Sequence, residues 1–411
     1  MEFKYFSFYK SISNFATNLI GVFLPLIIFK QTDNFILAIL FYLGQYILNI
    51  LFSAILKKLI FKKPQILLLY RIIPFVLYSI CIMLLEINVF VFAIPLCIFY
   101  ALNVALSVPP EEIILNYSSE ENYSSNLGIV DFLSYLFATL AVVAGGLILD
   151  KLSTITLTLI SAGLYAISII PLLIFYFKNK KNLTFNQEQT SNAVEQDKNE
   201  KAKEKARKSI ISRYSIILGL TFCIDACYAL MSLMLYIEFN VFTISAMVYG
   251  IIDIAYGVTS LIIGKIHEKK DISMFSKIAA FVCGLAILSI PFINNNTLLI
   301  IIITIPALLE PLLIIYLSDN MIQKTRILGV SNTALFNYTN SFWVTTSICL
   351  LTGLIGTLTP GIILAGLGTC TVGVMIDNHE KKTNQIVIDY LDQVQIKKKR
   401  KPKRKPAATI K

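Results

Sequence analysis

The sequence has few charged residues for its length, two histidines and a single tryptophan. Charged residues make up 15% of the 411 positions, against about 25% in soluble globular domains. Hydrophobic residues reach 56%, and the mean hydropathy is +0.71. Because a water-soluble fold cannot bury so much apolar surface, the composition excludes a cytosolic enzyme, a secreted disulfide scaffold and a disordered chain. A polytopic membrane protein remains.

Motifs for catalysis, metal binding or nucleotide binding are also missing. The seven cysteines lie inside apolar segments, and their odd number argues against a disulfide framework. Cys223 and Cys227 share a helix face but have no histidine nearby, and His267 and His379 lie in charged segments where we expect them to be solvated. We therefore expect no enzyme activity, no metal and no cofactor, and a proton, sodium or substrate gradient as the energy source.

Twelve apolar runs are long enough to cross a membrane, which takes about 20 residues. These runs are 12–29, 35–56, 66–85, 89–108, 127–149, 155–177, 214–237, 242–264, 275–293, 298–317, 333–355 and 360–376. They predict an all-α polytopic membrane protein with twelve transmembrane helices in two six-helix bundles. The bundles are residues 1–177 and 214–377, joined by a charged linker at 178–213 and followed by a basic tail at 378–411.

Basic residues predict the orientation. The net charge is +11, with eleven of the 36 lysines and arginines after residue 380 and ten between Lys178 and Arg213. If both termini are cytoplasmic, 32 of the 36 lie inside, as the positive-inside rule requires. We expect a monomer in the plasma membrane, with the linker mobile or a frayed charged helix. The tail is expected to be solvated or to touch anionic lipid rather than nucleic acid.

The two halves share a weak repeat. SAILKKLIFKK at 53–63 matches SLIIGKIHEKK at 260–270, an offset of 207, and LGIV at 127–130 matches LGVS at 328–331, an offset of 201. Short matches in apolar sequence arise by chance, but both fall on equivalent helices of the two halves. They favour the parallel six-helix repeats known in transporters.

With this organisation, residues 8 to 377 resemble the Major Facilitator Superfamily of secondary transporters. The family signature after spans two and eight reads Gly, three residues, Asp-Arg, any residue, Gly-Arg-Arg. Here only the basic positions remain: Ser53 and Ser260 stand at the first glycine, and the acidic residue and the second glycine of the signature are missing. The resemblance implies that this loop latches the halves together. The gating candidates it implies are Lys58, Lys62, Lys63, Lys265, Lys269 and Lys270.

Segment 126–150 resembles the fifth helix of drug–proton antiporters in the same family. It keeps the Gly145–Gly146 pair, but Ala141–Val142 stands where those antiporters carry Gly-Pro. The similarity to Gram-positive efflux members is therefore a loose one.

Acidic residues inside the apolar runs are the main site candidates, since a charge at the membrane centre costs about 3 kcal/mol or more. Asp225, Asp253 and Glu310 lie within spans seven, eight and ten. They are expected either to bind a proton or a cationic substrate or to hydrogen-bond to neighbouring Tyr and Asn. Arg71 is expected to form a structural pair with Asp131 or Glu112 or to act in gating.

Softer polar residues on the first two spans are further candidates. Gln45 and Asn49 are four apart and share a helix face, and Asn18 lies on span one. In the fold that the resemblance implies, these helices line the central path. Hydrogen bonds between helices are the alternative role for these amides.

The sequence thus predicts a secondary transporter that exports a small amphiphilic or cationic solute by alternating access, coupled to protons. The alternative is a non-transporting relative that acts as a membrane sensor, a lipid-handling protein or an immunity protein. The incomplete loop signatures favour this alternative, and the central acidic residues favour transport.

Overall fold

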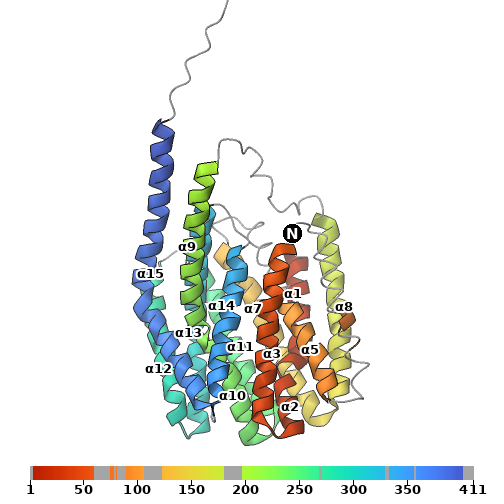
Figure 1. Cartoon of the computed structure of the whole chain (residues 1–411). Helices are drawn as coiled ribbons and strands as arrows, with labels where there is room; N and C mark the ends of the chain where they lie inside the picture. The colour runs from red at the N-terminus through yellow and green to blue at the C-terminus, as the bar shows by residue number, and fades with distance from the viewer. Residues whose placement is uncertain are drawn as a thin grey trace, which may run out of the picture.

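A computed structural model describes residues 3–59, 75–77, 80, 89–105, 123–179, 197–267, 271–328, 333–355 and 358–400. Every regular element within these ranges is helical (Figure 1). Nine helical stretches among the described residues are long and apolar enough to cross a membrane, and α5 and α14 fall on two further predicted spans. Helices therefore occupy eleven of the twelve predicted spans, and span 66–85 lies almost wholly outside the described residues.

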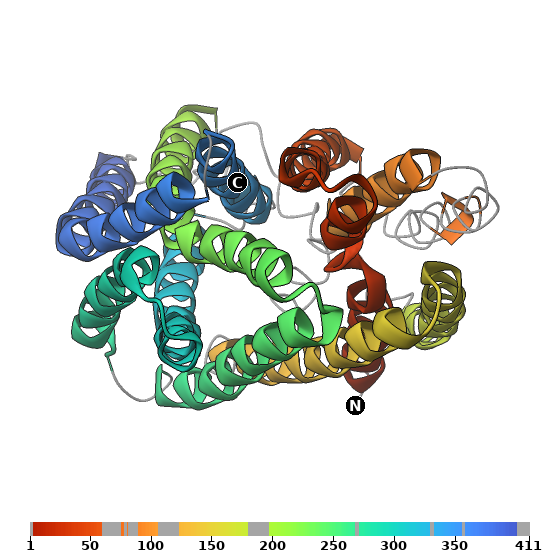
Figure 2. The ribbon, with the colours of Figure 1, turned by 90° about the horizontal axis from the view of Figure 1, so that it is seen from below.

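The helices form two groups that follow the chain order (Figure 2). The first half contains α1 (Phe3–Gly21), α2 (Leu24–Thr32), α3 (Phe35–Leu59), α5 (Val89–Ala105), α7 (Tyr123–Lys151) and α8 (Thr154–Asn179). The second half contains α9 (Asp197–Thr221), α10 (Cys223–Phe239), α11 (Phe242–His267), α12 (Ser273–Ser289), the short η4 (Ile290–Phe292), α13 (Asn296–Ile327), α14 (Thr333–Gly353) and α15 (Thr359–Arg400).

The first helix of each half is broken partway across its span. The break between α1 and α2 precedes Pro25, which lacks an N–H group and cannot continue the helical hydrogen bonds. The break between α9 and α10 falls at Phe222, after Thr221, whose hydroxyl donates to the Ile217 carbonyl at 3.1 Å. Broken helices of this kind flank binding sites in transporters.

The turns that follow these broken helices have the same geometry in both halves. Asp33 after α2 has φ 50°, and its N–H donates to the Phe29 carbonyl at 2.7 Å. Asn240 after α10 has φ 51°, and its N–H donates to the Tyr236 carbonyl at 2.8 Å. Asp and Asn enter this left-handed region more readily than other non-glycine residues. The two turns are 207 positions apart, the offset of the first sequence repeat.

Both ends of the described chain lie at one end of the bundle, which we call the terminal end; the α2–α3 and α10–α11 turns lie at the opposite, distal end (Figure 1). At the terminal end, α9 begins inside the predicted linker and α15 continues to Arg400, well beyond the predicted span end. Lys324 joins α9 to α15 near this end, since its Nζ donates to Tyr214 Oη at 3.1 Å and to Thr383 Oγ1 at 2.8 Å.

Two expectations about the terminal end change with this geometry. His379 is not solvated but 8% exposed, because its ring packs edge-on against Tyr214 with centroids 4.4 Å apart. His267 is half-buried and pairs with Asp319 at 3.0 Å. The contact of the basic tail with anionic lipid stays a prediction, and α15 carries the start of the basic run about 30 Å beyond residue 376 along its axis.

Candidate functional site

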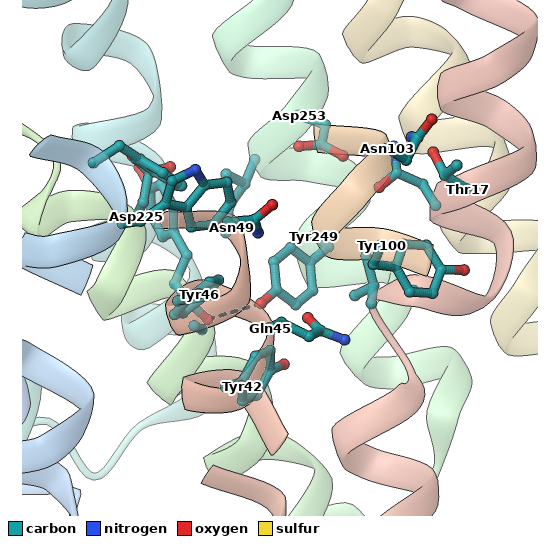
Figure 3. A pocket seen from close by; sticks show the side chains of 18 residues that line it. Thr17, Tyr42, Gln45, Tyr46, Asn49, Tyr100, Asn103, Asp225, Tyr249 and Asp253 are labelled. Atoms are coloured by element: carbon teal, nitrogen blue, oxygen red, sulfur yellow. Dashed lines mark hydrogen bonds between the residues drawn. The ribbon is translucent and has the colours of Figure 1, made fainter. Parts of the chain in front are cut away.

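A cavity of about 280 Å³ lies between the two halves, beside both helix breaks (Figure 3). Its walls come from α1, α3 and α5 of the first half and from α10, α11 and α14 of the second. The lining residues are Thr17, Asn18, Gly21, Val22, Tyr42, Gln45, Tyr46, Asn49, Tyr100, Asn103, Asp225, Tyr228, Ala229, Tyr249, Ile252, Asp253, Phe342 and Trp343. Because both halves contribute, any movement of one half against the other changes this cavity.

Five of the six predicted substrate or ion candidates line the cavity: Asn18, Gln45, Asn49, Asp225 and Asp253. Asp225 lies on the first turn of α10, directly after the break, and Asp253 lies midway along α11. Gln45 is 8% and Asn49 2% exposed. Gln45 Nε2 and Asn49 Oδ1 have no hydrogen-bond partner among the described residues. Buried polar atoms normally have one, so these amides offer free capacity to a molecule in the cavity.

The sixth candidate, Glu310, lies behind the wall rather than in it. It is 1% exposed on α13, between Pro306 and Pro311. Its carboxyl group lies near that of Asp225. Ionised carboxylates only accept hydrogen bonds, and without a proton on the pair the Glu310 oxygens have no donor among the described residues. A proton held between the two neighbouring carboxyl groups would supply the missing donor.

Aromatic rings, which were not predicted to belong to the site, cover much of the remaining wall. The Tyr46 and Trp343 rings are 4.8 Å apart across the two halves, and the Phe342 and Trp343 rings are 4.2 Å apart. Tyr42 and Tyr46 alternate with Gln45 and Asn49 at spacings of three and four residues, so they share the face of α3 that carries the amides. That spacing was the signal in the sequence for two of the seven aromatic residues in the wall.

The charge of this wall is entirely acidic. The described lining contains two aspartates and no lysine, arginine or histidine. Aromatic faces carry negative potential and attract cations within about 6 Å of the ring centre. Together, the carboxylates and the rings make a site with the chemistry to hold a positive charge.

Most of the gating candidates lie outside the described residues. Arg71, Glu112, Lys62, Lys63, Lys269 and Lys270 lie outside the described residues, as do the side chains of Lys58 and Asp131. Lys265 is exposed in the last turn of α11. The proposed Arg71 pair and the basic loop latch therefore stay predictions.

A sequence model described as the Major Facilitator Superfamily matches residues 6–336, four fifths of the chain. This chain belongs to the Major Facilitator Superfamily. The predicted family and all-α polytopic fold are thus confirmed, and the protein is a multi-pass membrane transporter. No curated protein sequence matches the chain.

Solved transporter structures share the fold at low sequence identity. The human organic anion transporter MFSD10 is 10% identical with a TM-score of 0.66, covering 91% of this chain and 98% of its own. A bacterial homologue of the iron transporter ferroportin, in an outward-facing state, is 9% identical with a TM-score of 0.65, covering 94% and 100%. The E. coli fucose:proton symporter FucP, in the outward conformation, is 14% identical with a TM-score of 0.56, covering 92% and 98%.

Proposed function

We propose that this protein is a proton-coupled exporter of small organic or amphiphilic cations that works by alternating access. The observation that carries the proposal is the cavity between the halves, which has two carboxylates, several aromatic rings and no basic residue in its described wall. The plasma membrane, with the terminal end in the cytoplasm, is the location that the basic residues favour.

The substrate's positive charge is assigned to Asp253 and the rings. Asp253 lines the cavity on α11, on the side where Asn103 and Thr17 of the first half also lie (Figure 3). The Trp343 and Tyr46 rings meet across the halves and supply the apolar surface that an amphiphilic cation needs. Cation–ring attraction is worth about 2 kcal/mol when the site is dry.

The coupling proton is assigned to the Asp225–Glu310 pair. Glu310 lies behind the wall while Asp225 faces the cavity, so a cation that approaches Asp225 meets one of the two groups that hold the proton. With one shared proton the pair keeps a single negative charge that attracts the cation, whereas a second proton neutralises the pair and removes that attraction. Proton and cation therefore compete for the same site, which is what exchange across the membrane requires.

Neutralising each carboxyl group separately tests these roles in proteoliposomes, with lumenal pH recorded while a panel of organic cations is added. We expect Asp225→Asn and Glu310→Gln to abolish cation-driven proton movement. Asp253→Asn should keep the coupling and raise the KM about tenfold, because one attraction of about 1.4 kcal/mol is lost. Glu238→Gln is the matched control, since Glu238 lies on α10 with Asp225 but is exposed.

Two results would contradict the proposal. Unchanged proton movement in Asp225→Asn, with normal folding, would remove the proton role of the pair. Silence of the unmodified protein across the whole panel would instead favour a sensor, lipid-handling or immunity protein on the same fold.

A further inference from the structure

The first turn of α11 is capped by a residue from the other half of the protein. The backbone N–H of Phe242 donates to Asp150 Oδ1 at 3.1 Å, and that of Thr243 donates to Asp150 Oδ2 at 3.0 Å. The Thr243 hydroxyl donates to the same carboxylate oxygen. Asp150 is the penultimate residue of α7, so these bonds join the first half to the second at the distal end.

The equivalent helix of the first half caps itself. The N–H groups of Ile36 and Leu37 donate to Asn34 Oδ1 at 2.9 and 3.3 Å, within the first turn of α3. The residue 207 positions after Asn34 is Val241, which precedes α11. Its side chain has no acceptor for an N–H group, and a helix start without a side-chain cap is less stable by about 1 kcal/mol. The second half therefore depends on Asp150 for a cap that the first half supplies from within.

The surroundings of Asp150 close the distal end tightly. Lys30 Nζ lies 5.0 Å from the centre of the Phe242 ring, which also packs edge-on against Phe23 at 5.9 Å. One turn before Asp150, a Cβ at Gly146 would lie 2.7 Å from the Ala246 Cβ. Contacts this close exist only while the two halves meet at this end.

We propose that Asp150 is an interdomain latch that holds the distal gate shut. When the halves separate at this end, Asp150 leaves the start of α11, and the Phe242 and Thr243 N–H groups lose their shared acceptor. The cap of α3 comes from Asn34 in the same half, so it does not depend on how the two halves meet. Asp150 thus stabilises the distal-closed state alone. The proposal rests on alternating access but on neither the substrate nor the coupling ion.

The test measures the distance between spin labels at Gln31 and Asn294, exposed positions near the distal ends of the two halves. The labels are attached through non-natural side chains to the full-length protein in lipid nanodiscs, which leaves the native cysteines in place. We expect Asp150→Ala to raise the ratio of distal-open to distal-closed molecules about fivefold, equivalent to about 1 kcal/mol. Asn34→Ala, which removes a cap from within one half, should leave the ratio unchanged.

A double variant separates the latch from simple helix stabilisation. Val241→Asn in the Asp150→Ala background gives α11 its own cap, as Asn34 does for α3. We expect it to restore thermal stability while the open fraction stays raised. If the double variant returns the ratio to its native value, or if Asp150→Ala leaves the ratio unchanged, the latch is excluded.

A milder variant covers the case in which Asp150→Ala does not fold. Thr243→Val removes only the hydroxyl bond to Asp150 and should raise the open ratio about twofold, equivalent to about 0.4 kcal/mol. No change in a folded Thr243→Val protein contradicts the latch. Because these measurements use no substrate and no gradient, failure of the proton-coupled export assay leaves their result intact.

Discussion

Two seams join the halves of this transporter: glycines bring the helices close together in one, and large rings on the cavity side fill the other. In the seam of α7 with α11, Cβ atoms added at Gly250 and Gly257 would lie 3.2 Å from Val143 and 3.1 Å from Tyr135. In the seam of α3 with α14, large rings meet instead, with Tyr46 and Trp343 4.8 Å apart. Small residues let membrane helices approach closely, whereas rings keep them apart and fill the space between them.

This difference separates holding the halves together from shaping the site. Both helices of the ring seam line the cavity, through Tyr42, Gln45, Tyr46 and Asn49 on α3 and through Phe342 and Trp343 on α14. No described residue of α7 lines it. Changes on the α7 side of the glycine seam should therefore act on stability and gating, and changes in the ring seam should act on substrate recognition.

The largest expected effect comes from filling the glycine seam. Gly146→Leu places a side chain where even a Cβ meets Ala246, so the helices must move apart; overpacking of this kind costs about 3 kcal/mol. Gly44→Leu on α3 is the matched control, because no described atom lies within 4 Å of a Cβ there. The free energy of unfolding in detergent measures both. If Gly146→Leu and Gly44→Leu lower the free energy of unfolding equally, the close approach of α7 and α11 does not contribute to stability.

A smaller effect is expected from opening the ring seam. Trp343→Ala removes a ring from the cavity wall and should raise the KM for an organic cation about tenfold, the equivalent of one cation–ring contact of about 1.4 kcal/mol. Tyr135→Ala removes a ring that packs on Tyr256 at 4.3 Å in the other seam. That variant should lower stability by about 1 kcal/mol with the KM unchanged. A change in KM in Tyr135→Ala would contradict the idea that α7 acts on stability and not on substrate recognition.

The predicted number and placement of helices follow from one physical requirement, that each span cover the apolar thickness of a bilayer. The same requirement says nothing about charged segments. α9 begins at Asp197 and α15 reaches Arg400 because apolar residues such as Ala206, Ile386 and Tyr390 pack against the core beyond the predicted spans. Hydropathy alone does not detect such a packed, charged helix, which is why the sequence leaves open whether the linker is mobile or a frayed charged helix.

The sequence predicts those site residues whose type is unusual for a transmembrane helix. Asp225 and Asp253 stand out because charges are rare in apolar runs. Tyrosine and phenylalanine are common throughout this chain, so Trp343 and Tyr46 gain meaning only from their contact across 297 positions. Asp150 resembled an ordinary residue at the end of a span, and only the fold brings it to Thr243.

The smallest effect tests whether hydrogen bonds add to the close packing of the glycine seam. Thr139 Oγ1 donates to the Gly250 carbonyl at 3.4 Å, across the halves. Thr139→Val should lower the free energy of unfolding by about 0.6 kcal/mol, the usual worth of such a bond in a membrane. Thr158→Val is the control, since among the residues that the structure describes the Thr158 hydroxyl bonds within its own helix, to the Thr154 carbonyl. If Thr139→Val costs as much as Gly146→Leu, this bond rather than close helix approach holds the seam, and the contrast between the two seams loses its physical basis.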